Sequence, residues 1–137
     1  MRLKQLLGIL LLPVVLGTIA AAAVSQLTNV NVVPQDNATT VTIQANGVFT
    51  HTEYRPSDNL LLVDLAGVSA GSMEGKAQAV KLPGVASYRV LGFKGAGGTE
   101  VARVELTLAP DAGVHISEGS HALLVKVTRF TDHSFHR

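Results

Sequence analysis

Short runs of apolar residues, most of them alternating with polar ones, recur along this chain between turns rich in Gly, Asn, Asp and Pro. The clearest run is Leu-Leu-Leu-Val-Asp-Leu-Ala-Gly at 60–67, which contains one acid and closes with a glycine. It is too short to span a membrane, and turn-forming residues stand at both of its ends, as is typical of a strand. We therefore predict that 60–67 is a strand buried on both faces at the middle of a small all-β domain, with Leu62, Val63 and Leu65 in the core.

The neighbouring segments show the period of two that is typical of half-buried strands. In 100–108, the even-numbered residues from Ala102 to Leu108 are predicted to face inward, while Arg103 and Glu105 face outward. The Gly-rich stretch 66–76 is predicted to be a loop. Further strands are predicted at 27–33, 40–46, 48–54, 79–82 and 85–93, with a terminal hairpin of 114–117 and 121–129. About eight short strands without any helical period predict an all-β fold, a two-sheet antiparallel β-sandwich.

The first 25 residues have the pattern of a secretory signal peptide. Residues 1–4 are basic, 6–16 are rich in leucine, and small residues allow cleavage near 22–25. An uncleaved membrane anchor is the alternative, since 6–24 carries no charge, but a proline, a glycine and an alanine-rich end favour cleavage. Either outcome predicts a periplasmic or secreted protein, with membrane contact only through this segment if it is kept. The domain is expected over 26–130, and 131–137 is expected to be a disordered tail.

Composition narrows the function classes. The 137 residues suffice for one domain. Of the 11 basic residues, Arg2 and Lys4 lie in the export segment, which leaves nine against 10 acidic residues. Such a near-neutral domain, with 4% aromatic residues and no Trp, is not expected to bind nucleic acid. The absence of cysteine excludes disulfides, thiolate nucleophiles, zinc–sulfur sites and a lipid-attachment cysteine.

Two short motifs carry possible chemistry, and neither predicts an enzyme. Residues 67–71 match G-x-S-x-G, but a nucleophile elbow at Ser69 needs a following helix and a parallel sheet, which this chain is too short to provide. Asp132, His133 and His136 form a potential ligand cluster, but the end of the chain offers nothing to fix its geometry. We therefore expect no catalytic set, no metal site and no cofactor.

Four residues are predicted to bind a ligand: Arg89, Arg103, Tyr54 and Arg55. Arg89 and Arg103 interrupt apolar strands, and on one open sheet face they could bind a carboxylate; solvated or ion-paired surface residues are the alternative. Tyr54 and Arg55 stand at the turn into the run 60–67. Asp64, inside that run, is expected to accept backbone N–H bonds or to pair with an arginine, in preference to a catalytic role.

These elements, taken in order, resemble the AMIN domain over residues 27–130. The segments that carry the resemblance are 41–47, 59–67, 85–91, 102–108 and 123–127. Asp64, Leu65 and Gly67 match the family's central strand, and Arg103 falls at its usual Arg-Val step. The chain departs from the family pattern at 59 and 60, where Asn and Leu replace the common Pro and Arg.

The resemblance implies a periplasmic β-sandwich of the kind that accompanies cell-wall amidases and type IV pilus secretins and localises them by binding peptidoglycan. We therefore expect a non-catalytic cell-envelope localisation module with peptidoglycan as its partner. A protein–protein interaction component of a type IV pilus or secretin assembly is the alternative, with secretin, pilus or amidase proteins as partners. A small secreted hydrolase is the weakest hypothesis.

Overall fold

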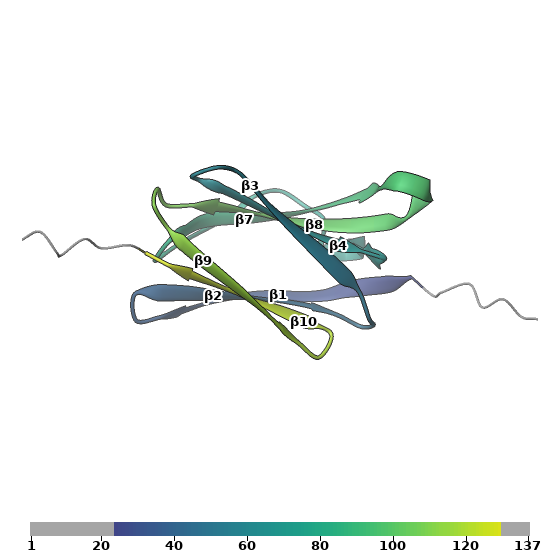
Figure 1. Ribbon diagram of the computed structural model, residues 1–137, viewed down its shortest axis with the longest axis horizontal. Coiled ribbons are helices and arrows are strands. Elements are labelled where there is room, and N and C mark those ends of the chain that lie inside the picture. The colour runs from purple at the N-terminus through teal and green to yellow at the C-terminus, as the bar shows by residue number, and fades with distance from the viewer. Residues whose placement is uncertain (1–23, 130–137) are drawn as a thin grey trace, which may run out of the picture.

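Ten strands form two five-stranded sheets that pack face to face, as Figure 1 shows. The computed structural model describes residues 24–129. The strands are β1 Ser25–Gln35, β2 Ala38–Ala45, β3 Thr50–Ser57, β4 Leu60–Ala66, β5 Val68–Ser69, β6 Gln78–Leu82, β7 Val85–Lys94, β8 Glu100–Leu108, β9 Gly113–Gly119 and β10 Ala122–Thr128. Sheet I has the order β5-β1-β2-β10-β9, and sheet II has the order β3-β4-β8-β7-β6. The predicted all-β sandwich is confirmed, and its strand pairs are antiparallel except for β1 with β5.

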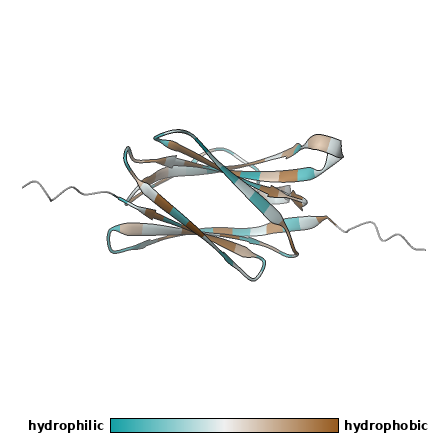
Figure 2. Ribbon diagram, viewed as in Figure 1, coloured by the Kyte–Doolittle hydropathy of each residue, from teal (hydrophilic) through white to brown (hydrophobic). Residues whose placement is uncertain are grey.

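The core lies between the sheets and consists of the inward-facing residues that the sequence alternation marks. Brown and teal positions follow one another along β8 and β9 in Figure 2, because successive side chains point to opposite faces. Sheet I and sheet II each contribute a layer of aliphatic side chains to this core. Among its fully buried members are Val41, Ile43, Leu123 and Val125 from sheet I, and Val63, Leu65, Val104 and Leu106 from sheet II.

The position predicted for residues 60–67 is wrong in two respects. Strand β4 is second from the edge of sheet II, and β8 occupies the centre. Burial along β4 alternates, so that Leu61, Val63 and Leu65 are buried while Leu62 and Asp64 are only half-buried. Leu62 faces outward because it alternates with the inward-facing Leu61 and Val63, and no described strand or helix covers the outer face of sheet II. A run of apolar residues therefore did not mean burial on both faces.

The stretch predicted as a loop contains a strand. After β4, Gly67 adopts a positive φ of 82°, which favours glycine, and the chain crosses from sheet II to sheet I. Val68 and Ser69 then pair in parallel with β1, and Val68 is fully buried. Two residues are too few for an alternation signal, so the sequence pattern missed this strand. A single-turn 3₁₀ helix, Gly71–Met73, follows it, and a second, Ala96–Gly98, joins β7 to β8.

The described chain begins and ends at opposite ends of the sandwich (Figure 1). Strands β1 and β10 lie on either side of β2, and each is antiparallel to it. They therefore run in the same direction, so β1 starts at one end of sheet I and β10 finishes at the other. Residue 25, the last expected cleavage position, already belongs to β1. The rest of the predicted signal peptide up to 23, and the predicted tail 131–137, lie outside the described residues.

Within residues 24–129, no helix has the length and apolar character that a membrane crossing requires.

Candidate binding face

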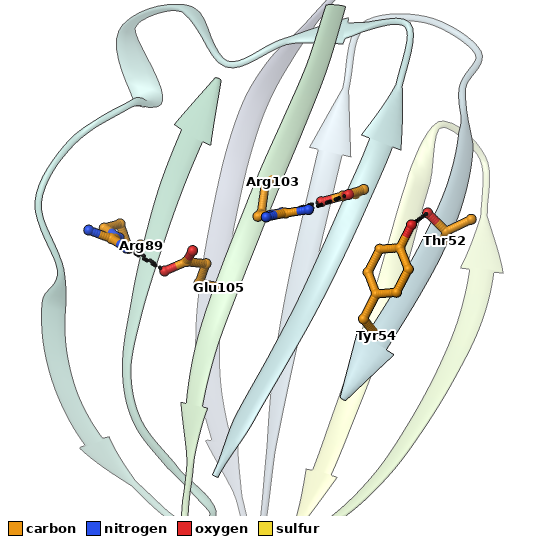
Figure 3. A network of polar contacts seen from close by, with 6 residues as sticks. Thr52, Tyr54, Arg89, Arg103 and Glu105 are labelled. Atoms are coloured by element: carbon orange, nitrogen blue, oxygen red, sulfur yellow. Dashed lines mark hydrogen bonds and ion pairs between the residues drawn. The ribbon is translucent and has the colours of Figure 1, made fainter. Parts of the chain in front are cut away.

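The outer face of sheet II gathers side chains from four strands into regular rows. Because side chains alternate between faces, residues that pair across neighbouring strands share a face. One row contains Tyr54, Leu62, Glu105 and Arg89, on β3, β4, β8 and β7. The next row contains Thr52, Asp64, Arg103 and Leu91. Figure 3 shows this face with its polar contacts. Arg89 and Arg103 thus meet the condition of sharing one open sheet face, and each is also ion-paired, as the alternative interpretation expected.

Arg103 forms a bidentate ion pair with Asp64, which lies directly opposite it on β4. Its Nε donates to Oδ1 at 2.7 Å, and its Nη2 donates to Oδ2 at 2.9 Å. The side chains retain only 28% and 12% of their exposure, so the pair is partly shielded from water. The hydrogen bonds to Asp64 raise the pKa of Arg103; desolvation opposes them, and the nearby carboxylate charges raise it further. The expectation that Asp64 pairs with an arginine is confirmed.

A second neighbour also fixes the Arg103 guanidinium. Its Cζ lies 5.0 Å from the centroid of the Phe93 ring, a distance at which the cation is attracted to the face of the ring. The Asp64 contacts occupy Nε and Nη2, and within residues 24–129 no hydrogen bond engages Nη1. Arg103 therefore presents a fixed positive group that has donors left for a ligand.

The other ion pair on this face is more exposed. Arg89 donates from Nε and Nη2 to the same oxygen of Glu105, Oε1, at 3.0 and 2.7 Å. The Arg89 side chain is 44% exposed and that of Glu105 is 20% exposed. An exposed pair of this kind contributes little to stability and can exchange partners readily. Arg89 lies beyond Glu105, on the side of the sheet away from β3.

Three of the four predicted ligand-binding residues meet at one shallow hollow. This hollow of about 470 Å³ is open to solvent and is lined by Tyr54, Arg55, Pro56, Leu62 and Arg103. Tyr54 is 48% exposed, and its hydroxyl lies 3.4 Å from that of Thr52. Arg55 donates from Nη2 to the carbonyl oxygen of Asp58 at 2.9 Å. Tyr54, Leu62 and two arginine residues thus line one hollow at the β3 edge of sheet II.

Sequence reasoning missed three contributors to this face: Leu62, Pro56 and Phe93. The pattern of the run 60–67 placed Leu62 in the core, so its outward position could not be expected. Phe93 could have been found, because it follows Arg89 and Leu91 at a spacing of two along a predicted strand. Pro56 had the signature of a turn and instead belongs to β3.

The two motifs that were weighed for catalysis or metal binding stand apart from this face. Ser69 lies in β5 of sheet I, and residues 24–129 include no α-helix to complete a nucleophile elbow. Within the same residues, no three His, Asp or Glu side chains gather closely enough to hold a metal ion. The cluster of Asp132, His133 and His136 lies outside the described residues.

No protein-family model matches this chain, and neither does any curated protein.

Proposed function

We propose that this protein is a non-catalytic cell-envelope localisation module that binds peptidoglycan through the outer face of sheet II. The observation that carries the proposal is the hollow beside Arg103, where a fixed cation, an aromatic ring and an aliphatic side chain stand together. Peptidoglycan offers peptide carboxylates and sugars that carry amides. The signal peptide predicted from the sequence and the resemblance of residues 27–130 to the AMIN domain support a periplasmic or secreted location for this binding.

The chemistry of the hollow suits such a ligand. Asp64 and Phe93 hold the Arg103 guanidinium in place, so binding immobilises little additional side chain. Its Nη1 can donate charge-assisted hydrogen bonds to a carboxylate. Tyr54 supplies an exposed ring against which an apolar sugar surface can lie, and Arg55 adds a second cation. The hollow is shallow, so we expect micromolar or weaker affinity that falls as salt is added.

A protein-binding function is the second candidate, in which the same face docks onto a secretin, pilus or amidase protein. The alternation of Asp64, Arg103, Glu105 and Arg89 favours it, because ordered charges of both signs select a complementary partner. Tyr and Arg are also enriched among the residues that contribute most to protein interfaces. This arrangement requires no cofactor.

Co-sedimentation with purified sacculi tests the proposal, using the protein as exporting cells process it, at low and high salt. We expect a salt-sensitive bound fraction that falls for Tyr54→Ala and Arg55→Ala, two exposed positions, and for Arg103→Lys, which keeps the charge but alters the fork of donors. Lys126→Ala, on the outer face of sheet I, is the matched control.

Two outcomes separate the hypotheses. If the protein sediments no more than an unrelated control protein, the peptidoglycan function is wrong and protein docking replaces it. If sedimentation is strong but none of the three substitutions changes it, the function stands and the outer face of sheet II is not the site.

A further inference from the structure

The four sheet edges are protected to different degrees, and β3 is the longest of the edge strands. A free edge exposes unpaired N–H and C=O groups, which can accept another strand. At the edges of sheet I, β5 has two residues, and β9 has seven, with a glycine at each end. At the other edge of sheet II, β6 has five residues, a register shift and Lys81 at a φ of 50°. Strand β3 has eight residues, and all but His51 are exposed; its pairing with β4 shifts register between Tyr54 and Ser57.

The accessible part of the β3 edge is its C-terminal portion. At His51, strand β9 approaches, because the Glu118 carboxylate lies 3.4 Å from Nδ1 of His51. From Thr52 to Ser57, every residue of β3 is exposed. Thr and Tyr in this stretch favour extended backbone, while Pro56 removes one donor near its end. The accessible stretch is therefore short, and Tyr54 lies near its middle.

The sequence of this stretch is complementary to itself in an antiparallel arrangement. If two copies pair about a two-fold axis through Tyr54, Glu53 of each copy lies opposite Arg55 of the other. The two Tyr54 side chains then face each other. Because the register shift of β3 lies between Tyr54 and Ser57, no regular pair is assigned beyond Arg55. Directly opposed residues in an antiparallel pair share a face, so both Glu53–Arg55 contacts join opposite charges.

Both charged groups have capacity for such contacts. The Glu53 side chain is 47% exposed, and its Oε2 lies 3.3 Å from Nε2 of His51. Arg55 uses Nη2 for the Asp58 carbonyl, which leaves Nε and Nη1 without a hydrogen bond to any described residue. The β9 edge has no comparable arrangement, because Glu118 is its one acid and it carries no Lys or Arg.

We propose that a second copy of this chain pairs with β3 in this antiparallel register and joins the two sheets II into one ten-stranded sheet. The closed two-fold contact uses the same surface on both copies, which is the commonest symmetry of homo-oligomers. A single added strand pair covers a small area, so the association is weak and depends on concentration. Tyr54 and Arg55 line the hollow on the outer face, so pairing brings the two hollows together at the axis.

Sedimentation velocity of the unmodified protein and of charge-reversal variants tests this proposal. The unmodified protein should show a monomer–dimer equilibrium as its concentration is raised. Glu53→Arg places two guanidiniums opposite each other, and Arg55→Glu places two carboxylates opposite each other. The dissociation constant of each variant alone should therefore rise by about tenfold or more. An equimolar mixture should form a heterodimer, and the double exchange Glu53→Arg with Arg55→Glu should restore the homodimer.

The mixture contains its own folding control, since heterodimers form only if both variants are folded. Lys126→Glu, on the outer face of sheet I, controls for net charge and should leave association unchanged. A protein that stays monomeric at every concentration overturns the proposal, and so does a dimer that persists in both single variants. Failure of the mixture to associate also overturns the register. The measurement needs no glycan, so its result is independent of the peptidoglycan proposal.

Discussion

The outer faces of the two sheets are built by the same alternation but carry different chemistry. The outer face of sheet I presents mainly amides and hydroxyls, together with the exposed apolar side chains of Val33 and Leu124. Lys126 is the one Lys, Arg, Asp or Glu among its paired strand residues in the described part of the chain. Its members include Asn29, Asn31, Thr40, Thr42, Gln44 and Ser117. The outer face of sheet II presents two ion pairs among aromatic and aliphatic side chains. Both sheets rest on one shared core.

Under the proposed function, the outer face of sheet I only contacts solvent, while the outer face of sheet II binds a ligand. Neutral amides and hydroxyls keep a sheet wettable, and their contacts are local, as when Asn29 Nδ2 donates to Gln44 Oε1 at 3.1 Å. A partly shielded ion pair is costly to desolvate and is a weak reason for stability by itself. Fold stability alone therefore does not explain why Asp64 and Arg103 form a partly shielded pair. Presenting a fixed guanidinium at the hollow beside β3 supplies one.

The largest effect is expected in the core that both faces share. Leu65→Ala in sheet II and Leu123→Ala in sheet I each remove a fully buried aliphatic side chain. Each variant should lower the free energy of unfolding by about 2–5 kcal/mol. Urea denaturation followed by circular dichroism and by tyrosine fluorescence measures this, with Thr42→Ala as the surface control. Two separate transitions in either variant would contradict a single core.

A smaller effect is expected from the shielded pair on sheet II. Asp64→Asn leaves Arg103 without its carboxylate, and an arginine stays charged near neutral pH even without such a partner, so it cannot relieve the loss by releasing its proton. We expect about 1–3 kcal/mol of destabilisation. The unfolding midpoint in urea measures it, and Glu105→Gln in the exposed pair is the matched control. Equal losses in the two variants would show that shielding does not distinguish the pairs.

The smallest effects are expected at the exposed charges. Arg89→Ala breaks a pair that is largely open to solvent and should cost about 0.2–1 kcal/mol, less in high salt. Lys126→Ala on sheet I should change stability by about 0.5 kcal/mol or less. Denaturation at low and high salt compares them. A loss at Arg89 that salt leaves unchanged would indicate packing of its aliphatic stem and not charge.

Periodicity in the sequence predicted which way side chains point, but not what they meet. The alternation in β8 placed Ala102, Val104 and Leu106 inward and Arg103 outward, as observed. It could not predict that Asp64 lies opposite Arg103, because the two residues are 39 positions apart and their contact depends on strand order and register. Strand order is decided by the packing of the whole sandwich, which a local pattern does not contain.

The errors have the same origin. Leu62 was assigned to the core because a mostly apolar run resembles a strand covered on both faces, whereas the outer face of sheet II is uncovered. Strand β5 was missed because its two residues join sheet I only through pairing with Ser25 and Gln26, far away in the chain. Three of the predicted binding residues nevertheless share one hollow, since the β3 side of sheet II collects them.

The parallel course of β1 and β10 has a mechanical consequence. A pull applied to the chain at Ser25 and Thr128 acts along the strands of sheet I and in opposite directions on the two sides of β2. The hydrogen-bond ladders on both sides are then loaded in shear, so that many bonds must break together. Had the two ends lain side by side, the ladders would open like a zipper, one bond after another. The domain can therefore carry tension between attachments at its two ends.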